Sequence, residues 1–206
     1  MRHLSARKCA LALGLCLLAG GQARADAVPW DYSSMLIPSV IKSDIPGMGQ
    51  INLTGVNSGQ VTGSSSIVLA NLQTASNADP SNPATFTNAG YQLAVTIVDG
   101  KTNTPGTVFF TGQINGVLSS GNALILNNFT GSTTQSQTIG GHQYSVTIGP
   151  FAPPGLPGVG NGSISALATV TVQEAPEPST LALSGLGLSL LGARWLRRRR
   201  AARARK

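Results

Sequence analysis

Charged residues are scarce in this chain, and cysteine is almost absent. Of 206 residues, 10% are Asp, Glu, Lys or Arg, 5% are aromatic and two are cysteine. Both cysteines, Cys9 and Cys16, precede residue 26, so we expect no disulfide or thiol chemistry beyond that point. Catalysis by proton transfer or nucleophilic attack needs ionisable groups. Residues 26–175 offer one histidine, His142, and therefore favour a protein that is not an enzyme.

The net charge of +7 comes from the two ends of the chain. Four of the fourteen basic residues precede residue 26 and eight follow residue 193, so only Lys42 and Lys101 lie between. Six acidic residues give residues 26–175 a net charge of −4. Nucleic-acid binding relies on cations that displace phosphate counterions. We therefore exclude a nucleic-acid surface on this central region.

The first 25 residues are typical of a secretory signal peptide. A positively charged start precedes the apolar residues 9–20 and the A-x-A sequence Ala23-Arg24-Ala25. We expect export through the Sec machinery and a mature chain that begins at Asp26. A slightly later cleavage, at Ala25-Asp26-Ala27, is the alternative.

The last thirty residues combine a proline motif, an apolar segment and a basic cluster. Pro176 and Pro178 lack N–H donors and favour extended backbone before them, which makes a stiff segment for a processing enzyme. Glu177 supplies its charge, and Ser179 can cap the helix expected at residues 180–193. That helix is about 21 Å long, so it is short for a bilayer unless the next residues extend it.

An arginine cluster follows this helix and sets its orientation. Basic residues stay on the cytoplasmic side of a membrane, so the chain before Ser179 is expected outside. The cluster consists of Arg194, Arg197, Arg198, Arg199 and Arg200, and residues 201–206 continue it as a basic tail.

This C-terminal order of features resembles the PEP-CTERM sorting signal. The resemblance rests on residues 176–183, on Gly185-Leu186-Gly187-Leu188 and on the arginine cluster, so it is confined mainly to residues 175–200. It implies an exosortase, a membrane-embedded processing enzyme, that cuts near residues 176–178. The protein would be anchored transiently in the inner membrane and then reach the cell surface or extracellular matrix. The resemblance also implies that the protein comes from a bacterium that makes exopolysaccharide. An ordinary membrane anchor is the alternative.

Residues 26–175 have the composition of an all-β protein, rich in Gly, Thr, Ser, Asn and β-branched residues. We predict an extended segment at 26–48, with an edge strand at 36–42, that leads into a domain at 49–175. The domain is predicted to be an antiparallel β-sandwich, jelly-roll or immunoglobulin-like. A signal helix and a transmembrane helix would flank it. Predicted strands are 50–56, 63–72, 91–99, 106–118 with a bulge at Gly112, 122–130, a hairpin through Gly140-Gly141, and 162–173.

The search for a chemical site in this domain gives no catalytic, cofactor or metal site. His142 follows the Gly-Gly turn and is interpreted as a turn residue, although Asp79 or Asp99 could complete a triad on paper. No nucleophile motif supports such a triad, and one histidine without cysteine excludes zinc. Oxygen atoms of Asn77, Asp79 and Asn82 in the predicted loop 73–90 leave a structural calcium open.

The favoured interpretation is an exported, non-enzymatic cell-surface or extracellular-matrix protein. A carbohydrate-binding or adhesive module, with extracellular polysaccharide as its partner, is the second interpretation, and a polymer hydrolase is the third. Exposed aromatics would favour the second. We expect Trp30 and Tyr32 instead to pack on the core. The proline-rich stretch 149–158 is interpreted as a rigid crossover, with a polyproline ligand as the alternative.

Overall fold

The computed structural model describes residues 27–172. Every regular element in that range is a β-strand, and none of the described residues forms a helix that could span a membrane. The predicted signal peptide, sorting motif, transmembrane helix and arginine cluster lie outside the described residues.

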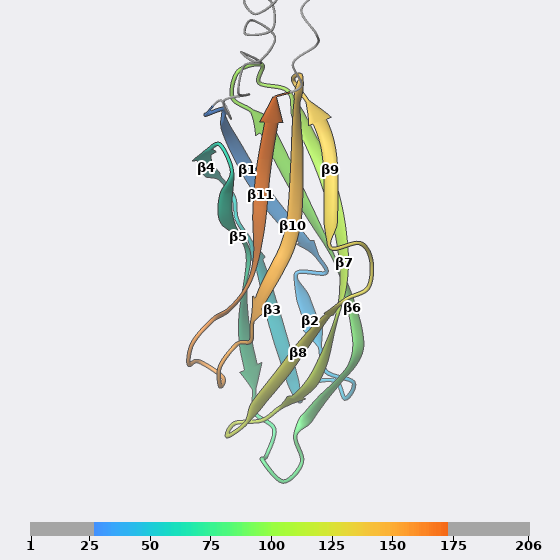
Figure 1. Ribbon diagram of the computed structural model, residues 1–206. Helices are drawn as coiled ribbons and strands as arrows, with labels where there is room; N and C mark the ends of the chain where they lie inside the picture. Colours follow the sequence, from blue (N-terminus) through green and yellow to red (C-terminus); the bar gives the residue numbers. More distant parts are fainter. Residues whose placement is uncertain (1–26, 173–206) are drawn as a thin grey trace, which may run out of the picture. The chain divides into compact units, whose positions relative to one another are not determined.

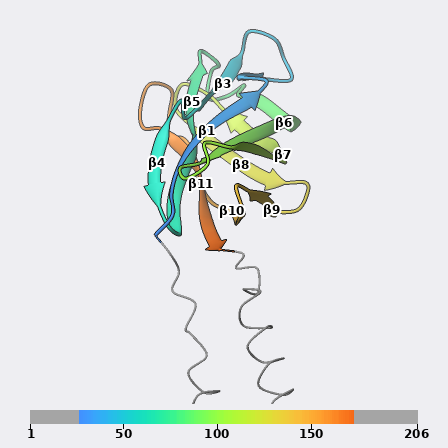
Figure 2. The same cartoon turned by 90° about the horizontal axis from the view of Figure 1, so that it is seen from above.

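The strands form two curled antiparallel sheets (Figures 1 and 2). The five-stranded sheet has the order β4-β1-β6-β7-β8, and the six-stranded sheet has the order β2-β3-β5-β11-β10-β9. The elements are β1 Pro29–Ile37, β2 Val40–Lys42, β3 Gly49–Gly55, β4 Gly59–Thr62, β5 Ser65–Ser76, β6 Ala84–Asp99, β7 Pro105–Leu118, β8 Ala123–Phe129, β9 Thr134–Ile139, β10 His142–Ala152 and β11 Gly162–Val172.

Alternation of side chains along the strands builds one core between the sheets. In the second half of β6, the odd-numbered residues from 91 to 99 are buried and the even-numbered ones are more exposed, as expected when successive side chains point to opposite faces. β11 repeats the pattern with buried even-numbered residues from 162 to 170. Fully buried side chains from both sheets include Trp30, Ile51, Leu69, Leu72, Leu93, Ile97, Ile114, Tyr144 and Ile164.

The two sheets are joined directly where β1 passes β3. Ser34 N donates to Val56 O, and Val56 N donates to Ser34 Oγ, each at 2.8 Å. The same hydroxyl donates to the backbone oxygen of Leu69 in β5. Gly55 permits this approach, because a Cβ at that position would lie 2.0 Å from the Ser34 carbonyl oxygen.

The all-β antiparallel prediction is confirmed, and so is the two-residue hairpin. Gly140 and Gly141 have φ angles of +60° and +84° between β9 and β10, which suits a turn that glycine favours. The strand predicted at 162–173 matches β11.

Several predicted boundaries differ from the structure. The predicted loop 73–90 shrinks to residues 77–83, because β5 and β6 extend into it from both sides. Within the predicted leading segment, residues 29–37 and 40–42 form β1 and β2, one strand in each sheet. The predicted bulge at Gly112 is wrong, because the irregularities lie between Phe86 and Ala89 and between Ile164 and Ser165. Gly112 instead makes room for Tyr91, whose hydroxyl would lie 2.4 Å from an added Cβ.

Candidate functional site

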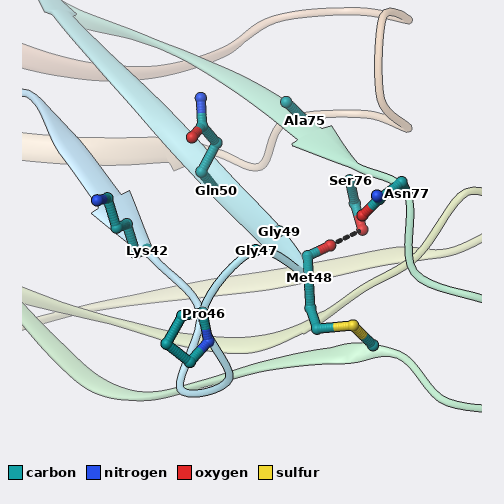
Figure 3. Close-up of a pocket in the computed structure, with 9 residues that line it drawn as sticks. All are labelled: Lys42, Pro46, Gly47, Met48, Gly49, Gln50, Ala75, Ser76 and Asn77. Atoms are coloured by element: carbon teal, nitrogen blue, oxygen red, sulfur yellow. Dashed lines mark hydrogen bonds between the residues drawn. The ribbon is translucent and has the colours of Figure 1, made fainter.

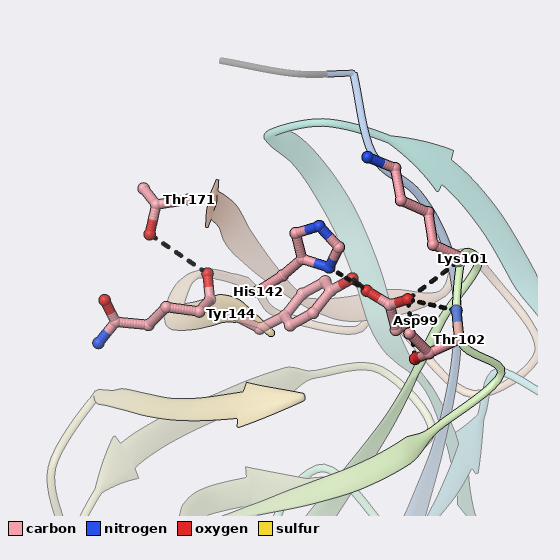
Figure 4. A network of polar contacts seen from close by, with 7 residues as sticks. Asp99, Lys101, Thr102, His142, Tyr144 and Thr171 are labelled. Carbon is pink, nitrogen blue, oxygen red and sulfur yellow. Dashed lines mark hydrogen bonds and ion pairs between the residues drawn. The ribbon is translucent and has the colours of Figure 1, made fainter. Parts of the chain in front are cut away.

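A buried carboxylate at the end of β6 is the centre of a polar network that joins the two sheets (Figure 4). Asp99 is fully buried. Its Oδ1 accepts hydrogen bonds from the backbone N–H groups of Lys101 and Thr102, at 2.9 and 2.8 Å, and from the Thr102 hydroxyl at 3.0 Å. Its Oδ2 lies 2.5 Å from His142 Nδ1 and accepts a hydrogen bond of 2.8 Å from the Tyr144 hydroxyl. Because His142 and Tyr144 belong to β10, Asp99 connects β6 of one sheet to β10 of the other.

The hydrogen bonds keep this buried carboxylate ionised. Burial raises the pKa of Asp99, but hydrogen bonds from Tyr144, Thr102 and His142 outweigh it and lower the pKa from 3.8 to about 2. Burial also raises the pKa of Tyr144, and its bond to the Asp99 charge raises it further, so the phenol remains a neutral donor. Because an ionised carboxylate can only accept hydrogen bonds, its contact with His142 requires a proton on Nδ1.

The interpretation of His142 as a turn residue is wrong. It is the first residue of β10, pairs with Ile139, and is only 6% exposed. Of the two carboxylates considered for a triad, Asp99 contacts His142, whereas Asp79 accepts hydrogen bonds from Ser81 in the turn before β6. Among residues 27–172, no serine hydroxyl is hydrogen-bonded to His142, so the histidine and the carboxylate form a pair without an aligned nucleophile.

Five of the nine aromatic side chains among residues 27–172 are buried in the core. Trp30 is 1% exposed, donates from Nε1 to Gly63 O at 2.9 Å, and meets Tyr144 edge-on with ring centroids 5.9 Å apart. The expected core packing of Trp30 is thereby confirmed. Tyr32 is half-buried and covers Gly59, where an added Cβ would lie 2.2 Å from its ring. Phe109, at 53% exposed, is the one aromatic among the exposed large hydrophobic side chains of the described region.

Two of the candidate calcium ligands, Asp79 and Asn77, lie beside protein hydrogen-bonding partners. Asp79 Oδ1 accepts from both the backbone and the hydroxyl of Ser81. The Asn77 side-chain amide is oriented with its nitrogen towards two backbone oxygens. That nitrogen donates to Gly47 O at 3.1 Å and to Met48 O at 3.3 Å. No cluster of three or more His, Cys, Asp or Glu residues suited to a metal occurs among residues 27–172.

Two adjoining hollows lie on the outer face of the six-stranded sheet. One of about 490 Å³ is bordered by Lys42, the turn before β3, and Gln50 (Figure 3). The other, of about 370 Å³, is bordered by Asn52, Gln73 and Asn161. They share Ala75. Gln50 pairs with Ala75 and Asn52 with Gln73 across β3 and β5, so the amide side chains stand in neighbouring rows. We call these two hollows the amide groove.

The C-terminal segment matches a known family. The family described as the PEP-CTERM protein-sorting motif covers residues 174–200. These residues are a PEP-CTERM sorting motif. The motif implies an exported, surface-associated protein that an exosortase processes. No curated protein and no solved structure matches this chain. The predicted sorting residues Pro176, Glu177, Pro178 and Ser179 fall within the matched segment but outside the described residues, as do the signal-cleavage residues Ala23, Ala25 and Asp26.

Strand alternation in the sequence carries a signal for the Asp99 network. Asp99 continues the buried odd-numbered positions of β6, and His142 shares the even-numbered positions of β10 with Tyr144. A carboxylate on the core side of a strand needs partners, because an unpaired buried charge is very costly. Their pairing across the two sheets depends on tertiary packing and not on spacing in the sequence.

Proposed function

We propose that this chain is an exported, non-enzymatic surface or matrix protein whose PEP-CTERM motif delivers a folded β domain to the cell exterior. The observation that carries the proposal is the motif at residues 174–200 directly after β11, which ends at Val172. Cutting at the motif leaves the last strand intact. The buried side chains identified in residues 27–172 extend to Val170, so the part of the core that the structure describes precedes the motif.

Within residues 27–172, the surroundings of His142 support the non-enzymatic part of the proposal. His142 is engaged by Asp99 and is nearly inaccessible. A hydrolase would place ionisable groups in an open cleft, where substrate can reach them. The amide groove contains one charged side chain, Lys42.

The sorting step is tested by altering the motif in a host that carries an exosortase. Pro176→Ala combined with Glu177→Ala should leave the chain unprocessed and in the membrane fraction. Ser163→Ala, a polar-to-alanine change in β11, is the control and should be processed normally. Normal processing of the motif variant would refute the proposed sorting mechanism and leave an ordinary anchor.

A carbohydrate-binding role is the second candidate, and the amide groove favours it. Side-chain amides present a donor and an acceptor together, which suits the hydroxyl groups of neutral sugars. The burial of Trp30, Tyr91 and Tyr144 removes the aromatic platforms that would have strengthened this candidate.

Purified extracellular polysaccharide from the producing cells is the probe for this second candidate. Asn52→Ala combined with Gln73→Ala should weaken retention on the polysaccharide. Gln143→Ala, an exposed amide on β10 outside the groove, should leave retention unchanged. Equal retention of all three proteins would eliminate the groove as a sugar site.

A further inference from the structure

The five-stranded sheet ends in an edge strand with exposed leucines. Leu124 and Leu126 of β8 are 56% and 57% exposed. On the neighbouring strand β7, Val117 pairs with Leu124 and Asn115 pairs with Leu126. Val117 therefore extends the apolar surface from the edge strand onto β7. Ile125 between them is buried, which leaves both leucines on the outer face.

The backbone of β8 has unused hydrogen-bonding groups along its free side. Ser119 N donates to Asn122 O, and Thr130 N donates to Thr111 O, at the two ends of the β7–β8 pair. Hydrogen-bonded pairs alternate in an antiparallel ladder, so Leu124, Leu126 and Asn128 bond to β7. The N–H and C=O groups of Ile125 and Asn127 therefore point away from β7. Among the described strands, β8 has β7 as its one hydrogen-bonded neighbour.

The other three sheet edges in the described region are less suited to pairing. β4 has four residues, and β2 has three and includes Lys42. β9 lies close to β7, because a Cβ on Gly106 would be 2.5 Å from Ile139. Proteins protect edge strands by shortness, charge, proline or cover. β8 has seven residues and contains neither charge nor proline.

We propose that β8 pairs antiparallel with β8 of a second copy of this chain, about a two-fold axis at Ile125. In this register Leu124 lies opposite Leu126 of the second copy, and the four leucines form one apolar cluster on the outer face. The free backbone groups of Ile125 bond to those of its symmetry mate, and Asn127 bonds to Ala123. The two five-stranded sheets become continuous.

The charge pattern favours a second copy as the occupant. A two-fold interface brings identical surfaces together. A charged residue on this edge would therefore lie close to the same charge on the second copy, and the repulsion would oppose association. Residues 102–173 contain no Asp, Glu, Lys or Arg. Two β8 edges therefore meet without charge repulsion.

The remaining termini of the processed chain are too short and too distant to cover β8. Figure 1 shows β1 beginning and β11 ending at the top of the view, whereas β8 lies in the lower half. This step relies on the proposed processing near residue 176, which leaves a few residues beyond Val172. Each residue spans at most about 3.6 Å. The dimer itself does not require processing, so the two proposals fail separately.

The experiment is sedimentation equilibrium of the protein recovered after expression of the full chain with an exosortase, either as the processed form or, if the chain stays unprocessed, in detergent. The wild-type protein should show a monomer–dimer equilibrium. Leu124→Lys combined with Leu126→Lys places like charges across the proposed pair and should weaken the dimer at least roughly tenfold. Phe109→Lys is the matched control, because Phe109 is 53% exposed on the outer face of β7 but pairs with Ala94 of β6, away from β8. It should dimerise like the wild type.

Engineered cysteines test the register independently of the lysine variant. The mature chain is expected to have no cysteine, so Leu124→Cys and Leu126→Cys each introduce one thiol. When the two proteins are mixed and mildly oxidised, the mixed disulfide should form faster than either symmetric one. A wild-type monomer at about 1 mM, an equal effect of Phe109→Lys, or faster symmetric disulfides would overturn the proposal. If the chain associates only with an added, different protein and not with a second copy of itself, the proposal is overturned as well.

Discussion

Asp99→Asn should destabilise the domain and flatten its response to acid. The substitution keeps the size of the side chain but replaces one acceptor oxygen with an NH₂ group. Both oxygens of Asp99 accept hydrogen bonds, Oδ1 from Lys101 and Thr102 and Oδ2 from His142 and Tyr144. Three donors lose their acceptor if the NH₂ group replaces Oδ1, and two buried donors lose theirs if it replaces Oδ2.

The expected loss is about 2–4 kcal/mol of unfolding free energy at neutral pH. An unsatisfied buried donor costs about 1–3 kcal/mol. The lowered pKa of Asp99 reflects the same hydrogen bonds, and a drop from 3.8 to about 2 corresponds to about 2 kcal/mol above pH 4. The folded state binds the Asp99 proton less readily than the unfolded state. The stabilisation is therefore present above pH 4 and is lost as the pH falls towards 2.

Urea unfolding followed by tryptophan fluorescence is a direct assay. Trp30 is the one tryptophan in residues 26–175, and it contacts Tyr144. The wild type should lose stability between pH 4 and 2 more steeply than Asp99→Asn. Asp79→Asn, which alters an exposed turn, should behave like the wild type. If Asp99→Asn unfolds within about 0.5 kcal/mol of wild type at pH 7, or keeps the full acid slope, the structural role of this network is refuted.

Three further predictions follow from individual contacts. Gly55→Ala should cost about 1–3 kcal/mol in urea unfolding, because its Cβ would lie 2.0 Å from the Ser34 carbonyl oxygen. A variant of wild-type stability would show that β1 and β3 can separate. Burial raises the pKa of Tyr91 to about 12 despite its bond to Asn127; its stabilisation is lost as pH rises from about 10 to 12, and Tyr91→Phe should reduce that loss. An unchanged alkaline slope would contradict this. Polysaccharide, ester and peptide substrates should show no turnover by the processed protein, and activity abolished by His142→Ala would contradict the non-enzymatic proposal.

The sheets were largely predictable because alternation is a local property. Strict alternation marked β11, and the Gly140-Gly141 pair marked the hairpin, since both depend on neighbouring residues. The extension of β6 back to Ala84 was missed, because Asp79, Pro80 and Pro83 are typical turn residues and Asn88 has a positive φ of 48° at an irregular register. The jelly-roll or immunoglobulin-like topology stays a prediction.

The candidate site was less predictable, because its parts come from different sheets. Asp99 and His142 are 43 positions apart, and no spacing rule connects them. The reverse holds for the C-terminal motif, in which the proline motif, apolar segment and arginine cluster are contiguous. A contiguous pattern can be identified without tertiary structure, whereas a network between sheets requires strand order.

The central claim is that an exosortase removes the C-terminal segment and leaves the β domain outside the cell. Intact-mass analysis of the surface fraction from exosortase-carrying cells tests it most directly. The surface fraction should contain a mature chain that begins near Asp26 and lacks residues 181–206. A surface form that still carries Arg197–Arg200 would contradict it.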